Sequence, residues 1–147
     1  MADKNTVEKT KKFSLVELLM IIMVVGIIFT LYIPLREDRI NQEKMKEAVR
    51  NIQIIARENV KFYHDPDRGD GFYAFDIAML DLGDRLQPMF DDEFLFEYSV
   101  TDSTVVATTN ENFSTKGAVI YYYLPNGPWH VADDRTSREV FNPAWLP

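Results

Sequence analysis

The hydrophobic pattern divides the chain into an apolar block, an amphipathic block and a stretch of alternating residues. Residues 13–34 read FSLVELLMIIMVVGIIFTLYIP and carry a single charged side chain, that of Glu17. An apolar helix of about 20 residues rises roughly 30 Å, which matches the hydrocarbon core of a bilayer. We therefore expect residues 13–34 to span a membrane, because a soluble domain of this size needs no helix that is apolar on every side.

The pattern then changes to an amphipathic helix over residues 35–64. A stripe at the 3-4 spacing of one helix face predicts a surface that packs on a globular domain. Its members are Met45, Ala48, Ile52, Ile55, Asn59 and Phe62, with Val49, Ala56, Val60 and Tyr63 beside them. Much of the remaining helix surface is assigned to Lys44, Lys46, Glu47, Arg50, Gln53, Arg57, Glu58 and Lys61. Because Pro66 disfavours helix at the residue before it, we expect the helix to end around His64.

The pattern of residues 65–147 predicts a globular α+β domain with a C-terminal tail. A turn-rich loop at 65–71 and one short helix within 72–86 precede the strands. Alternation and β-branched residues predict strands at 94–100, 104–108, 117–124 and 128–132. The expected fold is one long N-terminal helix packed on a small antiparallel sheet of about four strands. Phe141 and Trp145 predict that the tail folds back.

Charge and composition narrow the function classes. The net charge of −7 makes nucleic acid an unexpected partner, and the absence of cysteine excludes disulfides, thiol catalysis and zinc–thiolate sites. Residues 1–12 form a basic leader, whereas the charges of residues 36–39 cancel. The positive-inside rule therefore places the N-terminus in the cytoplasm and the domain outside. No small-residue cleavage site follows the apolar block at residues 32–36, which argues against a conventional signal peptide.

Glu17 needs a physical explanation, since a charge inside hydrocarbon costs roughly 2.5–3.5 kcal/mol on insertion scales. The residues three and four positions later, Met20 and Ile21, offer no counter-charge. One interpretation is that the carboxylate reaches back towards Lys11 and Lys12 at the membrane surface. The other is that its partner lies on another copy of the chain, so that the acid specifies assembly.

The same segment resembles the N-terminal signature of type IV pilins and of the pseudopilins of type II secretion systems. That signature has a basic leader, an aromatic residue at the cleavage point, a Leu-Val-Glu-Leu run, a central glycine and a closing proline. The matching residues are Lys11, Lys12, Phe13, Ser14, Leu15, Val16, Glu17, Leu18, Gly26 and Pro34. The spacings from Phe13 to the acid, the glycine and the proline all fit the signature.

The resemblance implies that a prepilin peptidase cuts before Phe13 and methylates the new amine. It implies that Glu17 pairs with the N-terminal amine of a neighbouring subunit, and that the helix loosens between Gly26 and Pro34. The implied partners are other copies or other pilins, an inner-membrane assembly platform and the bilayer. The implied location is the inner membrane, with a periplasmic domain, and then a filament.

One residue departs from the family pattern. The family has glycine before the cleavage point, where this chain has Lys12. A lysine side chain would have to enter a peptidase subsite that normally holds none. A second interpretation therefore stays open: an unprocessed single-pass membrane protein with an exported adhesive or ligand-binding domain.

Residues with other chemistry are few, and no catalytic constellation is found, so we expect no enzyme activity and no cofactor. Asp133 and Asp134 are weak calcium candidates, because major pseudopilins bind calcium in this region. A second group of acids at 65, 67 and 70 lacks the spacing of an EF-hand. The remaining candidates are interpreted as ordinary surface, core or strand residues, with no functional role. They are Arg68-Gly69-Asp70, His64, His130, Tyr121, Tyr122 and Tyr123. A carbohydrate-stacking surface is an alternative for the three tyrosines.

Overall fold

The computed structural model describes residues 14–147. The predicted processing residues Lys12 and Phe13 lie outside the described residues. The chain divides into two compact units, Met1–Arg36 and Glu37–Pro147. Helix α1 (Leu15–His64) contributes to both units and ends at the predicted residue. Its N-terminal part is long and apolar enough to cross a membrane.

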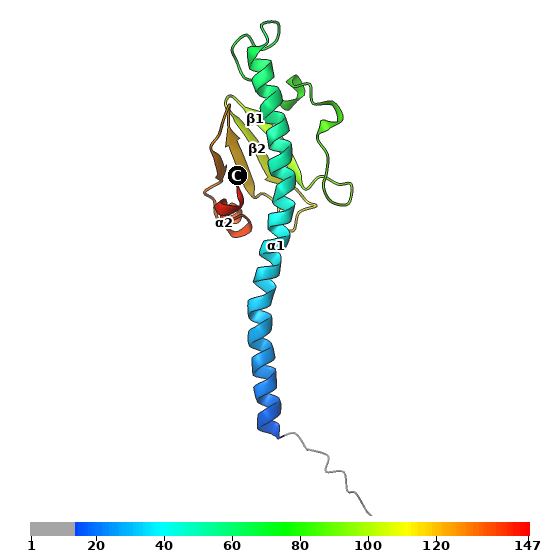
Figure 1. Ribbon diagram of the computed structural model, residues 1–147, viewed down its shortest axis with the longest axis vertical. Coiled ribbons are helices and arrows are strands. Elements are labelled where there is room, and N and C mark those ends of the chain that lie inside the picture. The colour runs from blue at the N-terminus through cyan, green and yellow to red at the C-terminus, as the bar shows by residue number, and fades with distance from the viewer. Residues whose placement is uncertain (1–13) are drawn as a thin grey trace, which may run out of the picture. The chain divides into compact units, whose positions relative to one another are not determined.

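The second unit contains the predicted antiparallel sheet (Figure 1). Its strands are β1 (Phe96–Thr101), β2 (Thr104–Thr109), β3 (Val119–Tyr123) and β4 (Trp129–Val131), which pair in the order β1-β2-β3-β4. Thr101 pairs with Thr104 across a tight turn, and Ile120 pairs with Val131 at the other edge. The four-stranded meander that the alternating pattern predicted is confirmed.

The core lies between the second part of α1 and one face of the sheet. Every member of the predicted stripe of α1 is buried, with at most 5% of its surface exposed. From the sheet, Phe96, Val105 and Ile120 point into the same core. The α+β fold with one long helix packed on a four-stranded sheet is therefore confirmed.

The C-terminal tail folds back onto this core, as expected. It forms α2 (Arg135–Val140) and the 3-10 helix η3 (Pro143–Trp145). The ring of Phe141 stacks on that of Phe96, with 6.1 Å between centroids, and meets Phe113 edge-on at 5.7 Å. These aromatic contacts fasten the tail without a disulfide.

The loop between α1 and β1 differs in detail from the prediction. It contains two 3-10 helices, η1 (Ile77–Met79) and η2 (Gly83–Arg85), in place of one short helix. The extended backbone of Leu80 ends the first, and Gly83, with φ +52°, lies in the left-handed region that glycine tolerates best. The first strand begins at Phe96 and not at residue 94, because the backbone N–H of Leu95 donates to a side chain of α1.

That side chain is Glu47, which the sequence pattern assigned to the polar surface. The structure contradicts this assignment, because Glu47 is completely buried. Its Oε1 accepts from the backbone N–H of Leu95 at 2.9 Å, and its Oε2 accepts from that of Met89 at 3.1 Å. A buried carboxylate with two backbone donors fixes the loop where it enters the sheet.

Two asparagines of α1 fix further points of the loop backbone. Asn51 donates from Nδ2 to the carbonyl of Gln87 at 3.2 Å and to the hydroxyl of Tyr98 at 3.0 Å. Asn59 accepts from the N–H of Ala74 at 2.8 Å and donates to its carbonyl at 3.5 Å. Both asparagines are fully buried. Their bonds satisfy loop backbone groups that would be paired with other backbone groups in a helix or a sheet.

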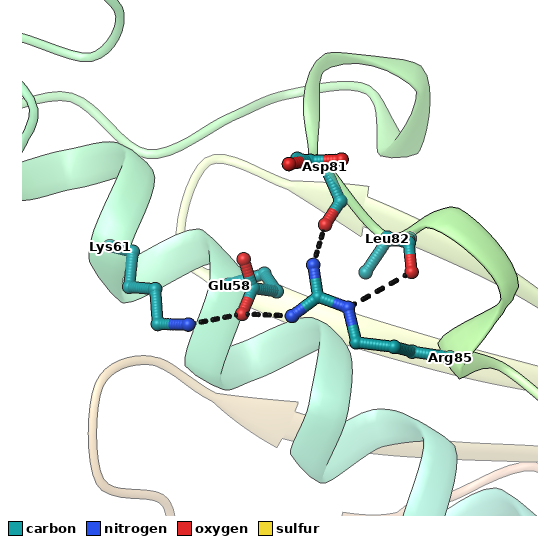
Figure 2. Close-up of polar contacts among 5 residues, drawn as sticks. All are labelled: Glu58, Lys61, Asp81, Leu82 and Arg85. Atoms are coloured by element: carbon teal, nitrogen blue, oxygen red, sulfur yellow. Dashed lines mark hydrogen bonds and ion pairs between the residues drawn. The ribbon is translucent and has the colours of Figure 1, made fainter.

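Glu58 is the second acid that the pattern wrongly placed on the surface, since only 9% of it is exposed. Its Oε1 lies 2.6 Å from Lys61 Nζ and 2.6 Å from Arg85 Nη1 (Figure 2). Arg85 in turn donates to the carbonyls of Leu82 and Asp81. Burial alone would raise the pKa of Glu58, but the hydrogen bonds from Lys61 and Arg85 outweigh it and hold this pKa below its ordinary value.

Replacing Glu47 by glutamine is expected to lower the free energy of unfolding of the second unit by about 1–3 kcal/mol. The new amide NH₂ would face a buried backbone N–H, which would lose its acceptor. Urea unfolding of the detergent-solubilised chain, followed by near-ultraviolet circular dichroism, measures the change. The matched control is Glu43→Gln, one helical turn earlier and exposed, with an expected change within about 0.5 kcal/mol. Equal losses in both variants would contradict the role of Glu47.

The ion pairs of Glu58 predict a pH dependence. Because its folded pKa is lowered, its stabilising contribution is complete above the unfolded pKa of about 4.3 and is lost as the pH falls through the folded pKa. Glu58→Gln is expected to cost about 1 kcal/mol at pH 7, since Lys61 and Arg85 are partly exposed. Urea midpoints of both proteins at pH 7, 5 and 3 should converge at the lowest pH. A constant difference across the series would refute the assignment.

Candidate assembly site

The N-terminal part of α1 exposes apolar surface on all sides. Every large apolar side chain of residues 15–35 is between 43% and 78% exposed, and Glu17 is the one charged residue among them. Such a surface requires apolar surroundings, supplied by lipid chains or by other helices. Because Glu17 is the one charged residue of this segment, the groups that bind its carboxylate decide which polar contacts the segment can make.

Glu17 has a partner within its own chain that the sequence analysis missed. The backbone N–H of Ser14 donates to Glu17 Oε2 at 2.9 Å, and the N–H of Val16 lies 3.4 Å from Ser14 Oγ. This is a variant of the capping box: the glutamate at the third helical residue accepts from the N-cap N–H, and the N-cap hydroxyl accepts from the second helical residue in place of the third. The Ser-x-x-Glu spacing of this motif is present in the sequence, whereas the partners predicted for Glu17 were charged groups and not a backbone N–H.

The capping bond leaves acceptor capacity on the same carboxylate. An ionised carboxylate has two oxygens and about four lone-pair sites. Within residues 14–147, Oε1 of Glu17 receives no hydrogen bond, and the residue is exposed. A cation carried by another molecule can therefore pair with Glu17 without breaking the capping box.

Gly26 and Pro34 both lie inside α1, which stays helical through them. A Cβ added at Gly26 would meet nothing within 4 Å, so no contact within one described copy requires a glycine there. Small residues in membrane helices allow close approach of a second helix. Pro34 has no N–H, so the carbonyl of Thr30 loses its usual helical donor.

Asp133 and Asp134 are engaged with protein groups. Asp134 is the N-cap of α2 and accepts from the N–H and the hydroxyl of Ser137 at 2.9 and 2.5 Å. These bonds, led by that from the hydroxyl, lower the pKa of Asp134. Asp133 pairs with Arg138 at 3.0 Å. Among the described residues, no group of three or more His, Cys, Asp or Glu side chains gathers in a metal-binding arrangement.

The acids at 65, 67 and 70 belong to the turn that ends α1. The carbonyl of Asp65 accepts from the N–H groups of Arg68, Gly69 and Asp70, and its Oδ1 accepts from that of Asp67 at 3.0 Å. Gly69 is required here, because an added Cβ would lie 2.1 Å from the carbonyl oxygen of Phe62. In the Arg68-Gly69-Asp70 tripeptide, the arginine stacks over the ring of Phe62 and donates to the carbonyl of Met79.

The three consecutive tyrosines divide between the two faces of the sheet. Tyr122 packs on Trp129, with 4.7 Å between ring centroids, on the face that carries the core residue Ile120. Tyr121 and Tyr123 lie on the other face and contact His130 at 5.4 and 5.6 Å. The other histidine, His64, meets the ring of Tyr63 edge-on. These contacts give both histidines and all three tyrosines structural surroundings.

Comparison with known proteins finds no matching family model, no matching curated protein and no matching solved structure. Among residues 14–147, the structure holds an apolar helical segment, a partly satisfied acid near the start of that segment and, in the second unit, a domain of α+β architecture.

The capping role of Asp134 can be separated from a calcium-binding role. Asparagine caps a helix as well as aspartate does, whereas alanine does not. Asp134→Ala is expected to lower the Tm by a few degrees, and Asp134→Asn by less, because the asparagine oxygen still accepts from the N–H of Ser137 while the charged acceptor of the Ser137 hydroxyl is lost. Differential scanning fluorimetry with calcium and with a chelator tests both variants. A calcium-dependent rise in Tm that Asp134→Asn abolishes would show instead that this carboxylate is a ligand.

Proposed function

We propose that this chain is a structural subunit of a filament of the type IV pilus or type II secretion pseudopilus kind. The observation that carries the proposal is Glu17, an acid within an apolar helical segment whose counter-charge is not found among residues 14–147. Support comes from the pilin-like arrangement of one long helix on a four-stranded antiparallel sheet.

In the proposed filament, the apolar segments of neighbouring copies pack together. Membrane helices associate by close packing and by polar contacts between helices, not by a hydrophobic force, and Gly26 offers a point of close approach. The amine of a neighbouring, processed subunit supplies the charge that Glu17 lacks. An acid buried without such a partner is strongly destabilising, so the pair selects the register of assembly.

Before assembly, the subunit is anchored in the inner membrane by residues 13–34, with its N-terminus in the cytoplasm and its domain in the periplasm. A prepilin peptidase removes residues 1–12 and methylates the amine of Phe13. An inner-membrane platform then draws the subunit into the filament. The function is mechanical, and no step requires a catalytic residue in this chain.

The alternative is an unprocessed single-pass membrane protein with an exported adhesive or ligand-binding domain. Two observations favour it: Lys12 stands where the family has glycine, and the capping box partly satisfies Glu17 within one copy. In this case the chain keeps its leader and needs no self-association. Intact-mass measurement of the membrane-extracted protein distinguishes the two functions, because processing removes residues 1–12.

Glu17→Ala is expected to preserve membrane insertion and to reduce filament yield by at least about tenfold, because breaking a buried ion pair costs about 3–5 kcal/mol. Membrane fractionation measures insertion, and electron microscopy of sheared material measures yield. The matched control is Ser14→Ala, which removes the hydroxyl of the capping box but keeps the carboxylate; it should retain assembly. A normal filament yield from Glu17→Ala would count decisively against the proposal.

A further inference from the structure

The net charge of the chain is concentrated in one loop. Residues 65–93 contain nine acidic and two basic residues, so this loop alone accounts for the whole excess of −7. The exposed face of α1 has the opposite character: Lys46, Arg50, Arg57 and Lys61 follow each other at helical spacing and are all exposed. The domain therefore presents one acidic and one basic surface.

The basic surface borders a groove beside the C-terminal part of α1. The groove has a volume of about 380 Å³ and is lined by Gln53, Ala56, Arg57, Val60, Lys61, Tyr122, Pro125 and Asn126. Ala56, Val60 and Tyr122 give it an apolar floor, and two cations stand at its rim. Lys61 shares Glu58 with Arg85, whereas Arg57 forms no ion pair with any residue from 14 to 147. The groove therefore suits an apolar group flanked by negative charge.

The acidic loop carries a group of this kind. In residues 70–76, Phe72 and Phe75 are 75% and 69% exposed, more than any other large apolar side chain of the second unit. Asp70 and Asp76 flank them, and both are exposed. Two phenylalanines held in water on a folded domain are typical of a contact surface.

The middle of this segment is anchored to α1. Between the two exposed rings, Ala74 is completely buried and bonds to Asn59 of α1 through its N–H at 2.8 Å. The ring of Tyr73 packs on that of Tyr63, with 4.6 Å between centroids. The exposure of Phe72 and Phe75 is thus a fixed feature of the fold, and little conformational freedom is lost when they dock.

We infer that residues 70–76 of one copy dock into this groove of a second copy, with Phe72 or Phe75 on the apolar floor and the carboxylates of Asp70 and Asp76 facing Arg57 and Lys61. The two surfaces differ from each other, so the contact is heterologous, and a docked pair still has one free groove on one copy and one free segment on the other. Contacts of this kind propagate into open helical assemblies unless they close into a ring. The inference rests on the proposed filament and names a lateral contact within it.

Photo-crosslinking of the full chain in its membrane tests this contact. Phe75 is replaced by p-benzoylphenylalanine, which keeps an aromatic ring at the docking position. Irradiation is expected to join two copies, and mass spectrometry of the adduct should locate the bond within residues 53–61 or 122–126. The matched control carries the same photoreactive residue at Phe94, which is exposed in the same domain but lies outside the segment, and should not label the groove.

A second variant tests the charge complementarity. Arg57→Glu replaces an exposed cation without an ion partner, so the fold should be preserved, and it is expected to lower the yield of the Phe75 adduct about fivefold. Lys116→Glu makes the same change of charge at an exposed site away from the groove and should leave the yield unchanged. The wild-type yield should also fall as salt is raised, because exposed charges are screened.

Several results would overturn the inference. Adducts to lipid would show that the segment meets the membrane, and adducts to a different protein or to another surface of the same chain would identify another occupant. If filaments form normally while Phe75 labels no groove residue, the docking contact is wrong and the proposed function stands. If copies do not associate at all, with Glu17 intact, the proposed function fails first.

Discussion

The structure depends on one helix that satisfies two different surroundings along a continuous backbone. Up to Leu35, the side chains of α1 are apolar on every side, apart from those of Glu17 and of Thr30, whose hydroxyl donates to the carbonyl of Ile27. Beyond that point only one face is apolar. That face contributes more buried side chains to the hydrophobic core than any other single element. A helix hydrogen-bonds its own backbone, so it suits lipid and protein surroundings equally well, and only the side chains need to change.

The second part of α1 also holds a loop that has almost no regular structure of its own. Glu47, Asn51, Glu58 and Asn59 bind this loop at points from Ala74 to Leu95, through backbone groups or through Arg85. Each bond satisfies a polar group that would otherwise be buried without a partner. This support explains how a segment of about 30 residues can present exposed phenylalanines in a fixed direction. The order of the acidic loop is thus a property of the helix beneath it.

The sequence pattern predicts burial that recurs at the period of a helix or a strand. It misses buried side chains whose burial depends on one distant partner. The stripe from Met45 to Phe62 could be predicted because burial recurs at the helical period, and the strands because burial alternates. Glu47 and Glu58 were wrongly assigned to solvent, because each binds a loop without periodicity that lies 27 to 48 residues away, Glu58 doing so through Arg85 in addition to its helical neighbour Lys61. At the candidate site, the assembly role of Glu17 stays a prediction, and the local bond to Ser14 was missed although its spacing was present.

The capping box at Ser14 and Glu17 bears on the filament proposed for this chain. Its donor is the N–H of Ser14, which remains an amide whether or not the chain is cut before Phe13, since Ser14 is then the second residue. The bond uses Oε2, and the amine of a neighbour would use Oε1. Within one copy, the carboxylate is therefore partly solvated by its own helix, which reduces the penalty of placing it near hydrocarbon. The same bond fixes the carboxylate in one orientation, so that less side-chain entropy is lost when the second donor arrives. If the proposed filament forms, the local cap and the intermolecular ion pair are therefore compatible uses of one acid, although the cap by itself also suits the unprocessed alternative.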